Sequence, residues 1–227
     1  MKALNYLKHL TAAVLISLFV VSCEKEDEKI EPIVKTSLTF SEIYTTNNED
    51  ISDVEIKENS IYVKDTKKLT KWHGVLLEED AVEAGANQII EYTITKQTDM
   101  ARVFVGYILN DDIDSFKIET TTNKYEFVYS QIYNLGVYPQ ISTDDTSMRI
   151  FGFYNKNEVA EPFFNYELGD RFKIELSDKK VKYYINDILI YTDINEVNQK
   201  ATPAISFTNA YPNEGEIQVS EIKISKY

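Results

Sequence analysis

The chain has 227 residues, of which 37 are acidic and 24 basic, giving a formal net charge of −13 at pH 7, and it contains one cysteine. So acidic a chain argues against nucleic acid and anionic lipid headgroups as partners of a folded domain, and a single cysteine excludes an intrachain disulfide. Aromatic residues make up 12 % of the sequence and β-branched residues are abundant, which favours strands over helices.

Residues 1–22 have the pattern of an export signal. Lys2 and Lys8 provide a positively charged start, and the apolar run at residues 10–21 is short for a membrane span. The run ends in Ser22-Cys23, which resembles the lipobox at which signal peptidase II cleaves. This resemblance implies a lipidated Cys23 whose diacylglycerol and acyl (palmitate) chains suffice for stable anchoring. The alternative is an uncleaved helix that ends at a cysteine by chance.

A charged segment follows the cysteine directly. Glu24, Lys25, Glu26 and Asp27 resemble the export signal of Bacteroidota surface lipoproteins, which implies an outer-membrane protein that faces the cell exterior. A periplasm-facing anchor is the alternative. Residues 23–37 are predicted to be the lipidated cysteine and an acidic, disordered tether.

From residue 38 onward, apolar and polar residues alternate in short runs, which predicts a single all-β domain over residues 38–227. Residues 101–109 are apolar on both faces, which predicts a central strand whose second face is covered or forms the floor of a groove. In the last strand the apolar phase shifts, and a bulge near Ser220-Glu221 would restore it. The expected strands are 38–44, 54–57, 60–64, 74–77, 88–96, 101–109, 114–121, 124–129, 136–140, 148–154, 171–176, 180–185, 188–192, 203–208 and 216–225.

Residues 169–192 predict two strands and a tight hairpin, around which the rest of the domain is organised. Asn186 and Asp187 tolerate the positive φ that a two-residue hairpin turn requires. The pairs that follow from this turn are Ile185 with Ile188, Tyr184 with Leu189, Tyr183 with Ile190, Lys182 with Tyr191 and Val181 with Thr192.

This stretch also carries a family resemblance. The run Gly-Asp-x-Phe-x-Ile-x-Leu from Gly169, a short turn, and Val-Lys-Tyr-Tyr-Ile-Asn-x-x-Leu-Ile-Tyr-Thr from Val181 resemble the C-terminal strands of concanavalin A-like lectin and glucanase domains. Trp72 with Gly74, and the run Gly-Ala-Asn-Gln-Ile-Ile-Glu-Tyr-Thr-Ile from Gly85, are similar too. The resemblance implies a jelly-roll β-sandwich of two antiparallel sheets, and it constrains fold more than function. An immunoglobulin-like sandwich is the alternative fold.

One acidic string suggests catalysis. Glu78-Glu79-Asp80-Ala81-Val82-Glu83 resembles the Glu-(Ile/Leu/Val)-Asp-x-x-Glu strand of laminarinase-type glycoside hydrolases, in which two carboxylates about 5 Å apart act as nucleophile and general acid. The resemblance assigns these roles to Glu78 and Glu83. It departs from the pattern at Glu79, where an apolar residue should anchor the strand in the core, so the segment is also interpreted as a strand end and turn.

Metal sites have little support in the sequence. His73 is the only histidine after residue 22, which excludes a multi-histidine site, and it is interpreted as a polar residue beside Trp72 at a strand start. Asp111, Asp112 and Asp114 offer the hard oxygen ligands of a structural calcium ion, although Asp is also an ordinary turn residue.

Aromatic residues outside the expected strands are the candidate ligand residues, because sugars stack on aromatic faces and accept hydrogen bonds beside them. The candidates are Trp72, Phe163, Phe164, Tyr166 and Tyr211. The sequence therefore predicts a cell-surface lipoprotein with a non-catalytic, lectin-like domain that binds a glycan. Two alternatives remain: a glycoside hydrolase using Glu78 and Glu83, and a structural or adhesive domain that contacts another protein.

Overall fold

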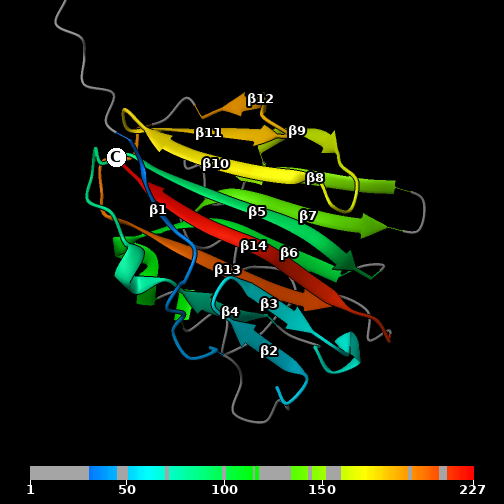
Figure 1. The fold of residues 1–227 in the computed structure, drawn as a ribbon. Helices are drawn as coiled ribbons and strands as arrows, with labels where there is room; N and C mark the ends of the chain where they lie inside the picture. The colour runs from blue at the N-terminus through cyan, green and yellow to red at the C-terminus, as the bar shows by residue number, and fades with distance from the viewer. Residues whose placement is uncertain are drawn as a thin grey trace, which may run out of the picture. The chain divides into compact units, whose positions relative to one another are not determined.

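The fold is known from a computed structural model, which describes residues 31–44, 51–69, 72–98, 101–114, 116–117, 134–142, 145–151, 160–193, 196–209 and 214–227 (Figure 1). The chain divides into two units, Met1–Glu31 and Pro32–Tyr227, and the description concerns the second. Cys23, the expected strand at 124–129 and Tyr211 lie outside the described residues. Within the described ranges, no helix has the length and apolar character needed to cross a membrane.

One antiparallel sheet, sheet A, has eight strands in the order β12-β11-β10-β5-β14-β3-β2, with β1 paired to β14 outside this path (Figure 1). Both long strands at its centre, β5 and β14, pair over most of their length. The strands of sheet A are β1 (Ile33–Lys35), β2 (Val54–Lys57), β3 (Ser60–Val63), β5 (Gln88–Gln97), β10 (Arg171–Ser177), β11 (Lys180–Ile185), β12 (Ile188–Thr192) and β14 (Ile217–Lys226).

The second antiparallel sheet, sheet B, has six strands in the order β4-β13-β6-β7-β8-β9. Its strands are β4 (His73–Leu76), β6 (Ala101–Leu109), β7 (Asn134–Ser142), β8 (Asp145–Phe151), β9 (Ala160–Asn165) and β13 (Ala201–Asn209). In the part of the chain that the structure describes, short 3-10 turns are η1 (Thr66–Lys68), η2 (Glu78–Asp80) and η3 (Asn110–Asp112).

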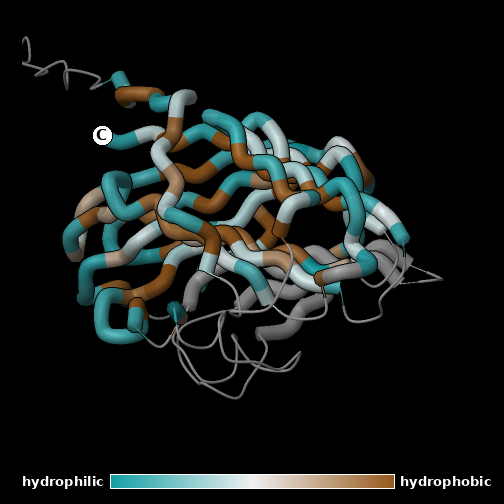
Figure 2. Tube along the Cα trace, turned by 90° about the horizontal axis from the view of Figure 1, so that it is seen from below, coloured by the Kyte–Doolittle hydropathy of each residue, from teal (hydrophilic) through white to brown (hydrophobic). Residues whose placement is uncertain are grey.

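The main hydrophobic core lies between the two sheets. Side chains alternate across a strand, so Val103, Val105 and Tyr107 of β6 point into the core, where they join residues of sheet A. Tyr92 of β5 stacks on Phe172 of β10 with ring centroids 5.0 Å apart. Figure 2 shows the apolar segments running along the strands and polar segments at many of the turns. The expected all-β sandwich of two antiparallel sheets is confirmed.

The hairpin between β11 and β12 confirms the predicted turn and only part of the predicted register. Asn186 and Asp187 have φ of 49° and 65°, as a type I′ turn requires. A bulge between Tyr183 and Tyr184 then shifts the pairing, because Ile190 and Tyr191 both pack against the core. The pairs Ile185–Ile188 and Tyr184–Leu189 are confirmed, whereas Tyr183 pairs with Tyr191 instead of Ile190, and Lys182 with Thr192 instead of Tyr191.

The bulge predicted in the last strand is confirmed. The register of β14 against β5 shifts between Ser220 and Lys223, and Glu221 adopts a φ of 54°. The extra residue brings Ile222 and Ile224 back to the core face that Ile217 and Val219 occupy.

Three expected assignments are wrong. Residues 38–44 form no regular strand but a strap: Leu38 N–H donates to the carbonyl of Glu58 in the β2–β3 turn at 2.8 Å, and Ser41 N–H donates to the carbonyl of Leu76 in β4 at 2.8 Å. The strap pairs with β4 in a single isolated bridge, Tyr44 with Gly74. In the expected strand at 114–121, the described residues 114, 116 and 117 are helical. Phe163 and Phe164, expected in a loop, belong to β9.

The folded unit also begins earlier than residue 38. The sheet includes β1, which lies within the expected tether, because Val34 pairs with Ser225. An ion cluster fixes this junction: Lys35 Nζ lies 3.0 Å and Lys226 Nζ 3.5 Å from the carboxylate of Asp80, a side chain that is 3 % exposed. Asp80 therefore links the first strand, the last strand and η2.

Replacing Asp80 by Ala should lower the free energy of unfolding by about 1.5–3 kcal/mol, the usual worth of hydrogen bonds to a charged group. Chemical denaturation of the full chain measures the change. Glu79→Gln is the matched control, because Glu79 is mostly exposed and lies 3.7 Å from Lys35, and we expect no measurable effect. Equal losses in both variants would contradict the assigned role of Asp80.

Candidate functional site

Sheet B has a second face, which points away from the sandwich core. Arg102, Phe104 and Ile108 of β6 alternate with the core residues Val103 and Val105, so they lie on this face. We call it the outer face of sheet B.

One part of the outer face is apolar and covered. Its cluster is almost inaccessible to solvent and comprises Trp72, Leu76, Phe104, Ile108, Phe116 and Ala204. Tyr44 and Ile113 pack over the cluster. Lys117 holds the cover in place, with its Nζ 3.0 Å from a carboxylate oxygen of Glu78 and 5.5 Å from the centre of the Tyr44 ring. The hydrogen bond to Glu78 raises the pKa of Lys117.

A row of polar residues crosses the other part of the outer face. Arg102 of β6 pairs with Thr208 of β13 on one side and with Gln140 of β7 on the other. Gln140 pairs with Ser147 of β8, which pairs with Asn165 of β9. Because residues paired across antiparallel strands share a face, these five positions form one line across the sheet. We call it the polar row.

The next positions along the strands carry aromatic residues and a second arginine. Arg149 of β8 pairs with Tyr138 of β7 and with Phe163 of β9. Each lies two residues from a member of the polar row along its own strand, and therefore on the same face. The register thus brings two aromatic positions to the same face as amide and hydroxyl residues, and residue types of this kind can stack on and hydrogen-bond to a polar ligand.

The expected exposure of two candidate residues is wrong. Trp72 is 1 % and Tyr166 is 3 % exposed, so both are core residues. The Tyr166 hydroxyl donates to Gln97 at 2.6 Å, and burial raises its pKa. Phe164 is half-buried against the main core. The strand register places Phe163 on the outer face of sheet B beside the polar row, while Tyr211 lies outside the described residues.

The acidic string does not form the strand that the hydrolase pattern requires. Residues Glu78–Asp80 form the 3-10 turn η2. Glu78 is 58 % exposed and pairs with Lys117, whereas Glu83 is 80 % exposed and its carboxylate lies 3.7 Å from Lys200. The two carboxylates thus pair with lysines from different parts of the chain.

The aspartates proposed for calcium lie in and just after η3. Asp111 and Asp114 are exposed and Asp112 is buried. Among the residues that the structure describes, no three His, Cys, Asp or Glu side chains are grouped so as to hold a metal ion. His73 is buried and stacks on Phe207, with ring centroids 5.8 Å apart, as a core residue would.

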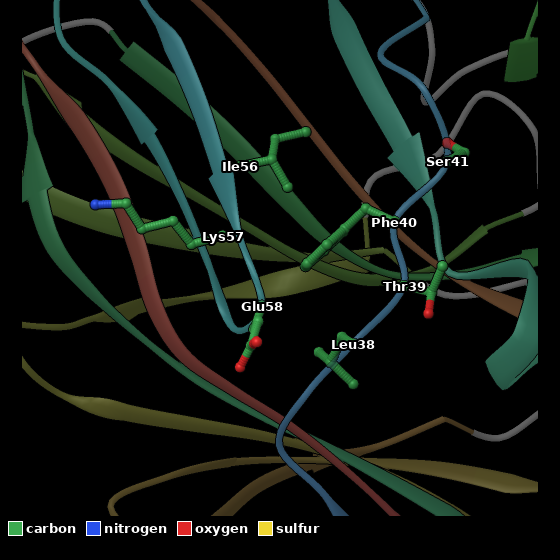
Figure 3. A pocket seen from close by; sticks show the side chains of 7 residues that line it. All are labelled: Leu38, Thr39, Phe40, Ser41, Ile56, Lys57 and Glu58. Atoms are coloured by element: carbon green, nitrogen blue, oxygen red, sulfur yellow. The ribbon is translucent and has the colours of Figure 1, made fainter.

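An open groove of about 610 Å³ lies elsewhere, between the strap and the β2–β3 turn. Figure 3 shows Phe40 pointing from the strap toward β2, and Lys57 pointing away from the strap. Leu38, Phe40 and Ile56 make its apolar part, and none of the sequence-predicted ligand residues lines it.

Paired charges cross the face of sheet A that points away from the core. Glu175 accepts hydrogen bonds from Ser177, Lys182 and Tyr184 at 2.9, 3.2 and 3.0 Å. Burial raises the pKa of Glu175, but these three donors together outweigh it and leave the pKa below its usual value. Lys173 lies 3.9 Å from the centre of the Tyr184 ring. The carboxylate of Glu175 therefore already has hydrogen-bond partners within the protein.

The comparisons with known proteins support the fold. No family model and no curated protein matches the chain in sequence. In structure, the chain is similar to a β-1,3-1,4-glucanase (lichenase) from a mouse hindgut metagenome, with a TM-score of 0.54, 6 % identity, and 86 % of this chain and 98 % of that one covered. A Bacillus licheniformis β-glucanase gives 0.53 and 8 %, over 88 % and 99 % of the two chains. A functionally unknown protein from Saccharomyces cerevisiae gives 0.53 and 9 %, over 84 % and 97 %.

These likenesses, with the two antiparallel sheets, define the class: the domain is a jelly-roll sandwich with the concanavalin A-like fold. At such low identity they show the fold alone, and the function has to be argued from the residues of the outer face.

Replacing Trp72 by Ala should lower the free energy of unfolding by about 3–5 kcal/mol, because it removes a large side chain from the covered cluster. Denaturant titration of the full chain measures this cost, and Trp72→Phe, which keeps an aromatic ring there, should cost distinctly less. If Trp72→Ala leaves stability unchanged, the side chain does not pack as described.

Proposed function

We propose that the domain is a non-catalytic carbohydrate-binding module that holds its glycan against the outer face of sheet B. The polar row is the observation that carries this proposal. The strand register sets residues that carry amide, hydroxyl and guanidinium groups in one line across the sheet, beside the aromatic positions 138 and 163.

The mechanism is stacking combined with hydrogen bonds. The aromatic residues Tyr138 and Phe163 would contact the C–H faces of sugar rings, while Gln140, Ser147 and Asn165 would bond to ring hydroxyls. The covered cluster closes the part of the same face that lies toward Ile108, so the ligand would run along the polar row.

The hydrolase alternative has less support. A retaining mechanism needs two carboxylates about 5 Å apart in one cleft, and the ion pairs of Glu78 with Lys117 and of Glu83 with Lys200 do not favour it. The adhesive alternative calls for a flat aromatic patch. Where the structure describes side-chain exposure, the exposed large hydrophobic residues Ile33, Val34, Leu168, Ile188, Leu189 and Tyr227 include a single aromatic residue, and the aromatic positions 138 and 163 of sheet B are separated by Arg149 of β8.

Binding of the full chain, purified in detergent, to an array of plant, algal and host glycans tests the proposal, followed by affinities for any ligand found. Gln140→Ala and Phe163→Ala should each weaken binding about tenfold, the effect of one lost contact of this kind. A form cut at residue 36 would be unsuitable, because it would lack β1 and Lys35.

Gln218→Ala is the matched control, because Gln218 lies in β14 on sheet A and its neighbours Ile217 and Val219 face the core. We expect unchanged affinity. If no glycan on the array binds, or if the variants and the control lose affinity equally, the result would contradict a binding surface on sheet B.

We also propose that Cys23 carries a lipid anchor and that the domain is displayed on the outer membrane, facing outward. The support is the sequence: the charged start, the short apolar run, Ser22-Cys23 and the acidic residues after it. The proposal gives the glycan-binding surface access to extracellular polymers.

Replacing Cys23 by Ala should abolish incorporation of labelled palmitate in a Gram-negative host and leave the chain uncleaved. Proteinase added to intact cells that produce the natural chain should degrade the domain. Protection until the outer membrane is broken would show a periplasm-facing anchor, and palmitate labelling of the Cys23→Ala variant would rule out the anchor at this residue.

A further inference from the structure

Strand β2 is the last strand at one end of sheet A, so one of its edges has no described strand beside it. On its other side it pairs with β3 through a two-residue turn at Glu58-Asn59, which sets Lys57 opposite Ser60 and Ile56 opposite Ile61. In such a hairpin, the pair next to the turn exchanges hydrogen bonds and the following pair does not. The backbone N–H and C=O of Ile56 therefore point away from β3, toward the open edge.

These two backbone groups of Ile56 are free to pair. The N–H of Val54, which also points outward, donates to Ile51 in the preceding turn at 3.0 Å. No hydrogen bond between described residues engages the outward groups of Ile56. An open edge of this kind is a template for a further strand, and a peptide that pairs with it gains affinity from main-chain hydrogen bonds.

The open groove of about 610 Å³ borders this edge and offers space for a side chain. Ile56, Leu38 and Phe40 form its apolar part, and Phe40 points from the strap toward β2 (Figure 3). Hydrogen bonds of Leu38 to the β2–β3 turn and of Ser41 to β4 hold the strap in place. A residue paired with Ile56 would share its face of the sheet, so its side chain would enter the groove.

The charges at the groove favour a basic ligand. Lys57 lines the groove but points away from the strap (Figure 3), and its Nζ lies 3.7 Å from a carboxylate oxygen of Glu55. Glu58 also lines the groove, is exposed, and forms no ion pair with any described residue. The net charge of −13 adds a long-range attraction for a cation.

We propose that an extended segment of a partner protein adds to the open edge of β2, with an apolar side chain in the groove and a lysine or arginine beside Glu58. The open edge supplies the main-chain hydrogen bonds, the groove selects the apolar residue, and Glu58 selects the charge. This site goes beyond the proposed glycan-binding surface, because it lies at the edge of sheet A and the polar row lies on sheet B.

Selection of random seven-residue peptides, displayed on phage, against the full chain in detergent tests the proposal. We expect the selected sequences to combine an apolar residue with lysine or arginine and to lack proline. A synthetic peptide with the selected sequence is then compared with a form that is N-methylated at alternate residues. Methylation at the positions that face β2 should weaken binding at least about tenfold, the effect of a lost hydrogen bond, and methylation at the other positions should not.

Ile56→Pro is the variant that tests the open edge. Proline has no N–H, and a strand tolerates it at an edge position whose N–H faces outward, so the pairing of β2 with β3 should persist. We expect binding of the selected peptide to fall at least about tenfold. Ile56→Val, which keeps the N–H and a branched apolar side chain, is the matched control and should bind almost as the natural chain does. Thermal melting of both variants separates lost binding from lost folding.

Glu58→Lys tests the charge, and its backbone carbonyl still accepts from Leu38. It should weaken binding of the selected basic peptide about fivefold, which is the upper end for an exposed ion pair. Glu167→Lys is the matched control, because it makes the same charge change at an exposed residue before β10, three strands away from β2. We expect its affinity to be unchanged.

Three results would overturn the proposal. The first is a selection that yields no peptide, and the second is a selected peptide that binds Ile56→Pro as tightly as the natural chain. The third is self-association of the natural chain that Ile56→Pro abolishes, because the occupant of the edge would then be a second copy. Equal losses in Glu58→Lys and Glu167→Lys would contradict the role of Glu58, because the effect would be one of overall charge.

Discussion

Strand β6 buries both of its faces, and much of the molecule follows from this constraint. On one face Val103, Val105 and Tyr107 build the sandwich core; on the other, Phe104 and Ile108 need a second cover. A strand that is apolar on both sides cannot face water, because each large side chain stabilises the fold by about 1.5–3 kcal/mol only when it is buried. The chain therefore places Tyr44, Ile113 and Phe116 over sheet B.

This cover decides where a ligand can lie. It occupies the part of the outer face around Phe104 and Ile108, and the hydrogen bond between Lys117 and Glu78 fixes it to η2. Glu78, which in the sequence suggests catalysis, here closes the cover. What remains of the face is the polar row, which starts at the opposite end of β6 with Arg102. Burial of one half of the sheet thus localises the candidate site to the other half.

The sequence predicted features that depend on near neighbours. The turn at Asn186-Asp187 and the bulge at Glu221 each follow from a few adjacent residues, through a tolerated positive φ or a shift of apolar phase. The all-β class followed from the alternation of apolar and polar residues, and the doubly buried β6 from a run that is apolar on both faces. Features that depend on distant partners were missed. The sequence of β1 is typical of a tether, and its pairing with β14 is what makes it a strand. The strap has the sequence of a strand, but its backbone hydrogen bonds divide between the β2–β3 turn and β4.

The candidate site is one of the features that depend on distant partners. The polar row draws its members from five strands, and sequence alone does not give the register that aligns Arg102 with Gln140 and Ser147. Trp72 was misjudged because a position at a strand start says nothing about a second apolar cluster above the sheet. A usable signal was nevertheless present, since Arg102 is the one charged residue in the otherwise apolar strand β6.

The two outer faces show how one sandwich separates stability from recognition. On sheet A, Glu175 is satisfied by Ser177, Lys182 and Tyr184, and such surface networks keep a sheet soluble at little gain in stability. Groups so engaged would have to lose existing bonds before binding anything. On sheet B, the strands that carry the polar row contain no lysine, and their register lines up the amide and hydroxyl residues Gln140, Ser147 and Asn165. A lectin-like surface needs that second composition, because amides and hydroxyls both donate hydrogen bonds to and accept them from the hydroxyl groups of a sugar.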